Sequence, residues 1–190
     1  MIPVAGLMLE ALYHRGVQRP PALLVAPMPK PPAAGSPMDL PILAELAWAL
    51  HRADHATLRF NPRGLGASQG RPGDHAAHVE DAEAALGQLL ANERVDRAAV
   101  LAVGGAAHVG LELAGRSGCA GLLLVAPPEE AAVAVAAATA GIPLRVLLAE
   151  GVPWPQGGSV ERVEGADATF LRGLPALGKA AAAFVAGLGR

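Results

Sequence analysis

The stretch that decides the fold is Leu58–Gly70, which reads LRFNPRGLGASQG. Its first residues end an apolar run, His55–Phe60, that predicts a buried strand. Asn, Pro and Gly then crowd the segment Asn61–Gly73, which predicts a turn-rich loop. Directly after the loop, Asp74–Asn92 carries apolar residues at helical spacing. Strand, loop and helix in this order are one unit of an alternating α/β fold.

The rest of the chain repeats this alternation on both sides of that unit. Short apolar runs predict strands at Ala22–Ala26, Ala98–Val103, Gly121–Ala126 and Leu144–Ala149, and helical patterns occupy Leu40–Arg52, Ala106–Ala114 and Pro175–Leu188. Such apolar strands indicate a mostly parallel sheet covered on both faces, a three-layer α/β/α sandwich. The alternating segment Ala5–Tyr13 is expected to be an antiparallel edge strand. Ligands in such sheets bind beyond the carboxyl ends of the strands.

Composition excludes several classes of protein. The 190 residues predict one domain, 1–190, and a net charge of −2 argues against a nucleic-acid surface, which needs a basic stripe. A single cysteine, Cys119, excludes a disulfide framework and a cysteine-based zinc site. No apolar tract is long enough for a membrane span and the N-terminus has no signal-peptide pattern, so we expect a cytoplasmic protein. Hydroxyl groups are scarce: against 42 Ala there are four Ser, at positions 36, 68, 117 and 159.

The segment quoted first resembles the small cap-less α/β-hydrolases, which carry L-R-F-N-x-R-G-x-G-x-S-x-G after a strand. Other segments are similar to that family in the same order: GLMLEAL, ALLVAPMP, AGSPMDL, HVEDAEAAL and LLLVAPP. The resemblance spans nearly the whole chain. It implies a cap-less α/β-hydrolase fold and, in the family, a Ser-His-Asp hydrolase.

The catalytic residues of that family are not found at the positions that the resemblance assigns to them. A nucleophile elbow needs G-x-S-x-G, and the matching residues here place Gly104 at the nucleophile. The acid would follow Leu144–Ala149, where the only carboxylate is Glu150. The base would stand at Ala168, and Ala26 and Met28 replace two histidines of a family loop. The resemblance therefore implies a degenerate member without a catalytic triad.

Other residues offer alternative chemistry, and each has a simpler structural interpretation. His75 and His78, with Asp74 and nearby acids, would share a helix face and bind a metal, or would form a capped, solvated helix N-terminus, which we favour. His108 would project toward the vacated pocket or, as we favour, pack within its helix. Cys119 is expected to be a core or loop residue.

Three loop residues match the family: Arg59, Asn61 and Arg63. We expect them to brace the loop through backbone carbonyls and a carboxylate, with anion binding as the alternative. Trp154 stands in the shortened acid loop, where it would anchor an interface or fill the hollow left by the missing side chains. Met28 is a second residue expected at an interface or pocket.

These features predict a non-catalytic pseudoenzyme that serves as an accessory, scaffold or binding subunit, with another protein subunit as partner. That partner would be an enzyme complex or a hydrolase-fold paralogue. We expect no nucleic acid, no membrane span and no cofactor. The alternatives are an enzyme with repurposed metal- or His-based chemistry and a small-molecule binding protein that uses the vacated pocket.

Overall fold

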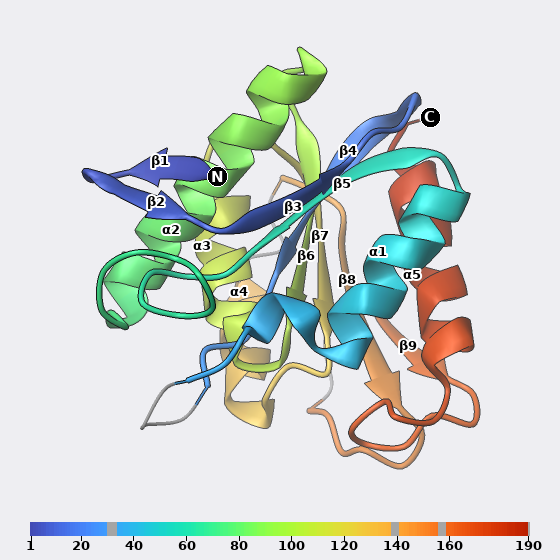
Figure 1. The fold of residues 1–190 in the computed structure, drawn as a ribbon. Helices are drawn as coiled ribbons and strands as arrows, with labels where there is room; N and C mark the ends of the chain where they lie inside the picture. The colour runs from blue at the N-terminus through green and yellow to red at the C-terminus, as the bar shows by residue number, and fades with distance from the viewer. Residues whose placement is uncertain (30–33, 138–140, 156–158, 190) are drawn as a thin grey trace.

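The structure, a computed structural model, describes residues 1–29, 34–137, 141–155 and 159–189. Its centre is a seven-stranded sheet (Figure 1). The strands, in spatial order, are β3 (Ala11–His14), β5 (His55–Phe60), β4 (Gln18–Val25), β6 (Ala98–Val103), β7 (Cys119–Val125), β8 (Leu144–Ala149) and β9 (Val160–Val163). Only β3 runs antiparallel to its neighbour, and the other pairings are parallel. The predicted mostly parallel sheet is therefore confirmed.

Helices cover both faces of this sheet, as Figure 1 shows. Helices α2 (His75–Glu93), α3 (Ala107–Ala114) and α4 (Ala132–Ala137) lie over one face, and α1 (Pro41–Arg52) packs beside α5 (Leu174–Gly187) on the other. The described residues also form three short 3₁₀ turns: η1 (Pro37–Asp39), η2 (Gly104–Ala106) and η3 (Glu129–Ala131). The three-layer prediction holds. Within the described residues, none of the helices is both long and apolar enough to cross a membrane.

The central strands are buried along the parts of their sequences that carry apolar side chains. All six residues of β6 are buried, as are the last six of β4. A strand buried on both faces cannot alternate polar and apolar residues, which is why these runs read as continuous apolar segments. The core on either side of the sheet therefore fixes the position of each strand end and of the loops that follow.

The expectation of one edge strand at Ala5–Tyr13 is wrong in part. Strands β1 (Ile2–Val4) and β2 (Leu7–Leu9) form a separate hairpin around Ala5 and Gly6, which both have positive φ. Only β3 joins the sheet, and it does so at the edge. The sequence does not predict strand β9 or helix α4. The four residues of β9, VERV, are mostly half-buried or exposed, so they do not form a continuous apolar run, and α4 has only six residues, too few to show a helical pattern.

Candidate functional site

The candidate site lies where the parallel strands end at their carboxyl termini. The loop 61–73 follows β5, Gly104 follows β6, Glu150 follows β8, and Ala168 lies in the loop between β9 and α5. The carboxyl ends of neighbouring parallel strands share one edge of a sheet, and ligands bind in the crevices there. The topology thus brings the residues expected for the nucleophile, acid and base to the same edge.

Asn61 is the buried centre of the loop that follows β5. Its Oδ1 accepts a hydrogen bond from the backbone of Met38 at 3.0 Å, and its Nδ2 donates to the Glu10 carboxylate at 2.7 Å and to Ser36 Oγ at 2.9 Å. Ser68 Oγ donates to the carbonyl of Asn61 at 2.6 Å. The loop is therefore tied to both the N-terminal segment and the turn η1.

Arg63 ties the same loop to helix α2. Its backbone N–H and its Nε and Nη2 atoms all donate to the carboxylate of Asp81, at 2.6–2.8 Å, and Asp81 has no exposed surface. The hydrogen bonds to Asp81, then those to Glu80, raise the pKa of the Arg63 guanidinium against the effect of its burial. Arg59 donates to the carbonyl of Met38 at 2.9 Å. These contacts, to carbonyls and carboxylates, are the kind that a bracing role requires.

Two glycines of the quoted motif are required by close approach. Gly66 has φ +55°, and a Cβ there would collide with the side-chain nitrogen of Asn61. Gly64 has φ +74°, and a Cβ there would collide with the backbone of Arg71 and Pro72. The spacing R-G-x-G thus follows from the packing of the loop onto itself.

Gly104 occupies a sharp turn between strand β6 and helix α3. It directly follows the last residue of β6, has φ +55°, and begins η2, which leads into α3 without a break. A strand-to-helix turn with a left-handed residue at its tip is the backbone of a nucleophile elbow. Here the tip has no side chain.

Ala168 and Glu150 lie on two loops that contact each other. Glu150 is exposed, and its Oε2 accepts a hydrogen bond from the Gly165 amide at 3.4 Å. Ala168 lines a cavity of about 280 Å³ together with Ala149 and Phe170. Among the described residues that line this cavity, Glu129 alone is ionisable. No histidine is therefore found among the described residues that line the cavity next to the expected base position.

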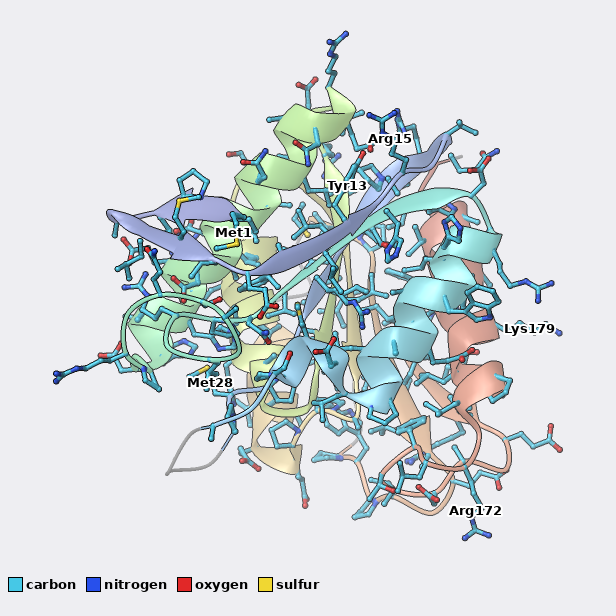
Figure 2. The ribbon with its side chains drawn as sticks, in the orientation of Figure 1. Met1, Tyr13, Arg15, Met28, Arg172 and Lys179 are labelled. Atoms are coloured by element: carbon cyan, nitrogen blue, oxygen red, sulfur yellow. The ribbon has the colours of Figure 1, made fainter. Side chains whose placement is uncertain are left out.

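The loop around Ala168 is organised by Asp167. The Asp167 carboxylate accepts hydrogen bonds from the Thr169 hydroxyl at 2.7 Å and from the backbone of Thr169, Leu171 and Arg172 at 3.0–3.1 Å. The Thr169 hydroxyl has the largest part in lowering the pKa of Asp167 to about 2. Phe170 is buried, with positive φ, and the Arg172 side chain projects outward (Figure 2).

Met28 and the two histidines of α2 line one cavity. Met28 lies beside the loop 61–73 (Figure 2) and lines a cavity of about 480 Å³ with Pro72, His75, His78 and Gly105. Gly105 is the residue next to the elbow tip. The structure thus brings Met28 and the His75/His78 pair together with the elbow.

His108 and Trp154 lie elsewhere. His108 is half-buried and lines a neighbouring cavity with His75 and Glu112. Trp154 is half-buried and packs against the core on the α2–α4 side of the sheet. Both predicted roles of Trp154, at an interface or in the hollow left by the missing side chains, stay predictions.

The interpretation of the α2 N-terminus as solvated is corrected for His78. Asp74 does cap the helix, with its Oδ1 accepting from the Ala77 amide at 3.0 Å, and His75 pairs with Glu112 at 2.6 Å in solvent. His78, however, is only 4% exposed, and its Nε2 has no hydrogen-bond partner among the described residues. Burial lowers its pKa to about 4, despite the opposing charge of Asp81.

The remaining polar side chains do not form a metal or nucleophile site. Within residues 1–29, 34–137, 141–155 and 159–189, no three His, Cys, Asp or Glu side chains are grouped to hold a metal ion. Thr57 Oγ1 lies 3.4 Å from His14 Nδ1, but Thr57 is buried in the middle of β5. Cys119 is a core residue, and burial raises the pKa of its thiol, which disfavours a reactive thiolate.

Comparison with known proteins identifies the fold. No family model and no curated protein matches the sequence. Among solved structures, an α/β serine hydrolase homologue from Coxiella burnetii matches with TM-score 0.72 at 22% identity, covering 97% of this chain and 99% of that one. The chain has the fold of the lid-less α/β-hydrolases.

Two further structures agree with this assignment. A member of the α/β serine hydrolases without lid, from Xanthomonas campestris, matches with TM-score 0.69 at 19% identity over 91% of this chain and 86% of that one. A protein of unknown function from Agrobacterium tumefaciens matches with TM-score 0.73 at 22% identity over 93% and 89%. At these identities the likeness shows the α/β-hydrolase fold and leaves the activity open.

Within this α/β-hydrolase fold, sequence reasoning missed one feature of the site, the burial of His78. A signal was present, because His78 stands four residues before Ala82 and eight before Leu86, on the apolar face of α2. The polar neighbours Asp74, Glu80 and Asp81 instead favour the prediction that this part of the helix is exposed to solvent. Asp81 is itself buried because Arg63 pairs with it.

Proposed function

We propose that this chain is a non-catalytic protein of the α/β-hydrolase fold, which acts by binding and not by hydrolysis. One observation carries the proposal: Gly104, at the tip of the strand-to-helix turn, has the left-handed backbone of an elbow and no side chain. A nucleophilic mechanism needs a hydroxyl or thiol at that tip. Glycine supplies neither.

The residues around the turn support the same proposal. The expected base position is Ala168, whose methyl group faces a cavity. Glu150, the carboxylate in the expected acid loop, is exposed and bonded to the Gly165 amide. An acyl-transfer site without its triad retains at most about 10³–10⁴-fold acceleration over water, from binding and oxyanion stabilisation. Such a residue set favours a binding role.

The partner in this proposal is another protein subunit, with the chain as an accessory or scaffold. The surface offers a large aromatic anchor: Trp48 on α1 is 56% exposed, with the Arg52 guanidinium 5.9 Å from its ring centre. Trp and Arg are the residues that most often dominate binding energy at protein interfaces. Their position on an exposed helix leaves the elbow region free for a separate ligand.

The experiment that tests the non-catalytic proposal is ester turnover by the purified protein. With p-nitrophenyl acetate and butyrate, we expect the rate of the wild-type protein to equal that of Gly104→Ala, a variant that also lacks a nucleophile. A saturable rate above buffer in the wild-type protein, whether or not Gly104→Ala retains it, would overturn the proposal.

A further inference from the structure

The wall of the cavity beside the elbow includes a buried histidine, His78, whose Nε2 has no partner among the described residues. The cavity of about 480 Å³ lies between the loop that holds Met28, the N-terminal turn of α2 and the residue Gly105. His78 lines this cavity and is only 4% exposed. Its Nε2 forms no hydrogen bond within the described part of the chain. Buried polar atoms are nearly always paired, so an unpaired one inside a cavity wall points to a missing partner.

The other residues that line the cavity indicate how polar the missing partner is. Met28, Pro29, Pro72 and Val109 give the cavity an apolar wall, and its volume lies in the range of small-molecule sites. An apolar wall with one unsatisfied polar atom fits a largely apolar molecule that carries one hydrogen-bonding group.

Charges around the cavity favour a neutral ligand. Asp74 lines the cavity, and Glu112 pairs with His75 at its rim, so an anion would meet two carboxylates. A cation would meet the positive end of the α2 dipole. His78 itself is neutral near pH 7, because burial lowers its pKa to about 4.

A hydroxyl is the group that suits a neutral imidazole in either tautomer. It donates to an unprotonated Nε2 and accepts from a protonated one. We propose that this cavity binds a neutral, largely apolar small molecule through a hydroxyl group hydrogen-bonded to Nε2 of His78. The proposal rests on the non-catalytic function in one respect: without a nucleophile at position 104, the ligand is held and released unchanged.

Access to the nitrogen requires a side chain to move. Nε2 has almost no contact with solvent, so the hydroxyl reaches it only when a lining side chain shifts. Met28 is half-buried and has three rotatable side-chain bonds, which makes it the most adaptable member of the lining. Binding is therefore expected to change the environment of the Met28 methyl group.

The experiment uses phenol as the probe and toluene as the matched molecule without the hydroxyl. We follow the imidazole nitrogens of His78 and the Met28 methyl by NMR during each titration. Phenol is expected to shift the Nε2 resonance and the Met28 methyl, and to bind roughly threefold to tenfold tighter than toluene, the effect of one net hydrogen bond. Absence of a shift at Nε2 with millimolar phenol would overturn the proposal.

Variants separate the hydrogen bond from general apolar binding. His78→Phe keeps a ring but removes the nitrogen, so its affinities for phenol and toluene should become equal. His51→Gln, exposed on α1 and outside the lining of this cavity, should keep the preference for phenol. A preference that persists in folded His78→Phe would overturn the proposal, and the wild-type NMR titration decides the matter if that variant fails to fold.

The two proposals fail in different ways. Hydrolysis of phenyl acetate by the wild-type protein would overturn the non-catalytic function and leave the phenol binding intact. Failure of the phenol titration in a protein without ester turnover would overturn the ligand site and leave the non-catalytic function intact.

Discussion

Gly104 and Pro27 are separated by enough space for a side chain: a Cβ at Gly104 would lie 3.8 Å from the Cβ of Pro27, an ordinary van der Waals contact. Apart from its chain neighbours and the backbone of its own helical turn, no other atom of the described residues lies within 4 Å of that Cβ position. Packing therefore does not require glycine here. The positive φ favours glycine, but the elbow tolerates the same backbone in enzymes that place a nucleophile on it.

The Gly104→Ser variant should fold and remain inactive. A left-handed non-glycine residue costs about 1–2 kcal/mol, which for a chain of this length lowers Tm by roughly 3–6 °C. The serine would lack an activating base, because position 168 is alanine. Thermal unfolding checks the first expectation and p-nitrophenyl acetate turnover the second. Esterase activity in this variant would mean that a base lies within reach of position 104.

The Arg63–Asp81 pair should be the main attachment of the loop 61–73 to α2. Asp81→Ala leaves the largely buried Arg63 guanidinium without its main partner, and we expect a loss of about 3–5 kcal/mol in the free energy of unfolding. Glu80→Ala removes the other, half-exposed carboxylate on the same guanidinium and should cost less than about 1 kcal/mol. Urea unfolding of the two variants checks the contrast. Equal losses of unfolding free energy in the two variants would show that the burial of Asp81 does not strengthen its pairing with Arg63.

His78 should make the stability depend on pH in a defined window. Its pKa is about 4 in the folded protein and about 6.5 in the unfolded chain, so the unfolded state binds more protons between these values. The free energy of unfolding should therefore fall as pH is lowered from 6.5 to 4, by a total on the order of 3 kcal/mol, with no further loss from this residue below that.

The variant that tests this pH effect is His78→Phe. Urea unfolding across pH 4–7 should give a flatter profile for His78→Phe than for the wild-type protein. An unchanged profile in His78→Phe would assign the dependence to other groups.

Much of the fold could be predicted from the sequence, because the buried strands are continuous apolar runs. His55–Phe60, Ala98–Val103 and Leu144–Ala149 were predicted with the bounds that the structure has. The elements at the edges of the fold are harder to predict from the sequence. The hairpin at residues 2–9 depends on contacts with a distant loop, such as the hydrogen bond from the Gln69 amide to the carbonyl of Met8 at 2.9 Å. The short strand β9 depends on its pairing with β8.

The site was predictable where a motif is local and less so where burial is set by a distant partner. The absence of a side chain at Gly104 is read directly from the sequence. The burial of Asp81 depends on Arg63, eighteen residues earlier, and the burial of His78 depends on helix and loop packing together. A charged or polar side chain predicts solvent exposure unless its partner is known, which explains this error.

Asp167 should hold the loop that carries Ala168. Asp167→Ala removes the acceptor for the amides of Leu171 and Arg172, so hydrogen exchange at both amides should accelerate by at least about tenfold. Lowering the pH of the wild-type protein through about 2 should have the same effect, because protonation weakens the carboxylate as an acceptor. Glu164→Ala, on the same loop, is the control and should leave exchange unchanged. Unaltered protection in Asp167→Ala would show that Phe170 packing alone orders the loop.

The most direct test of the central claim is intact-mass analysis after incubation with a fluorophosphonate, which labels activated serine nucleophiles. The intact mass reports an adduct on any of the four serines, at positions 36, 68, 117 and 159, in one experiment. The account predicts no mass increase in the wild-type protein under conditions that fully label a serine hydrolase. A stoichiometric adduct on any one of these serines would contradict it.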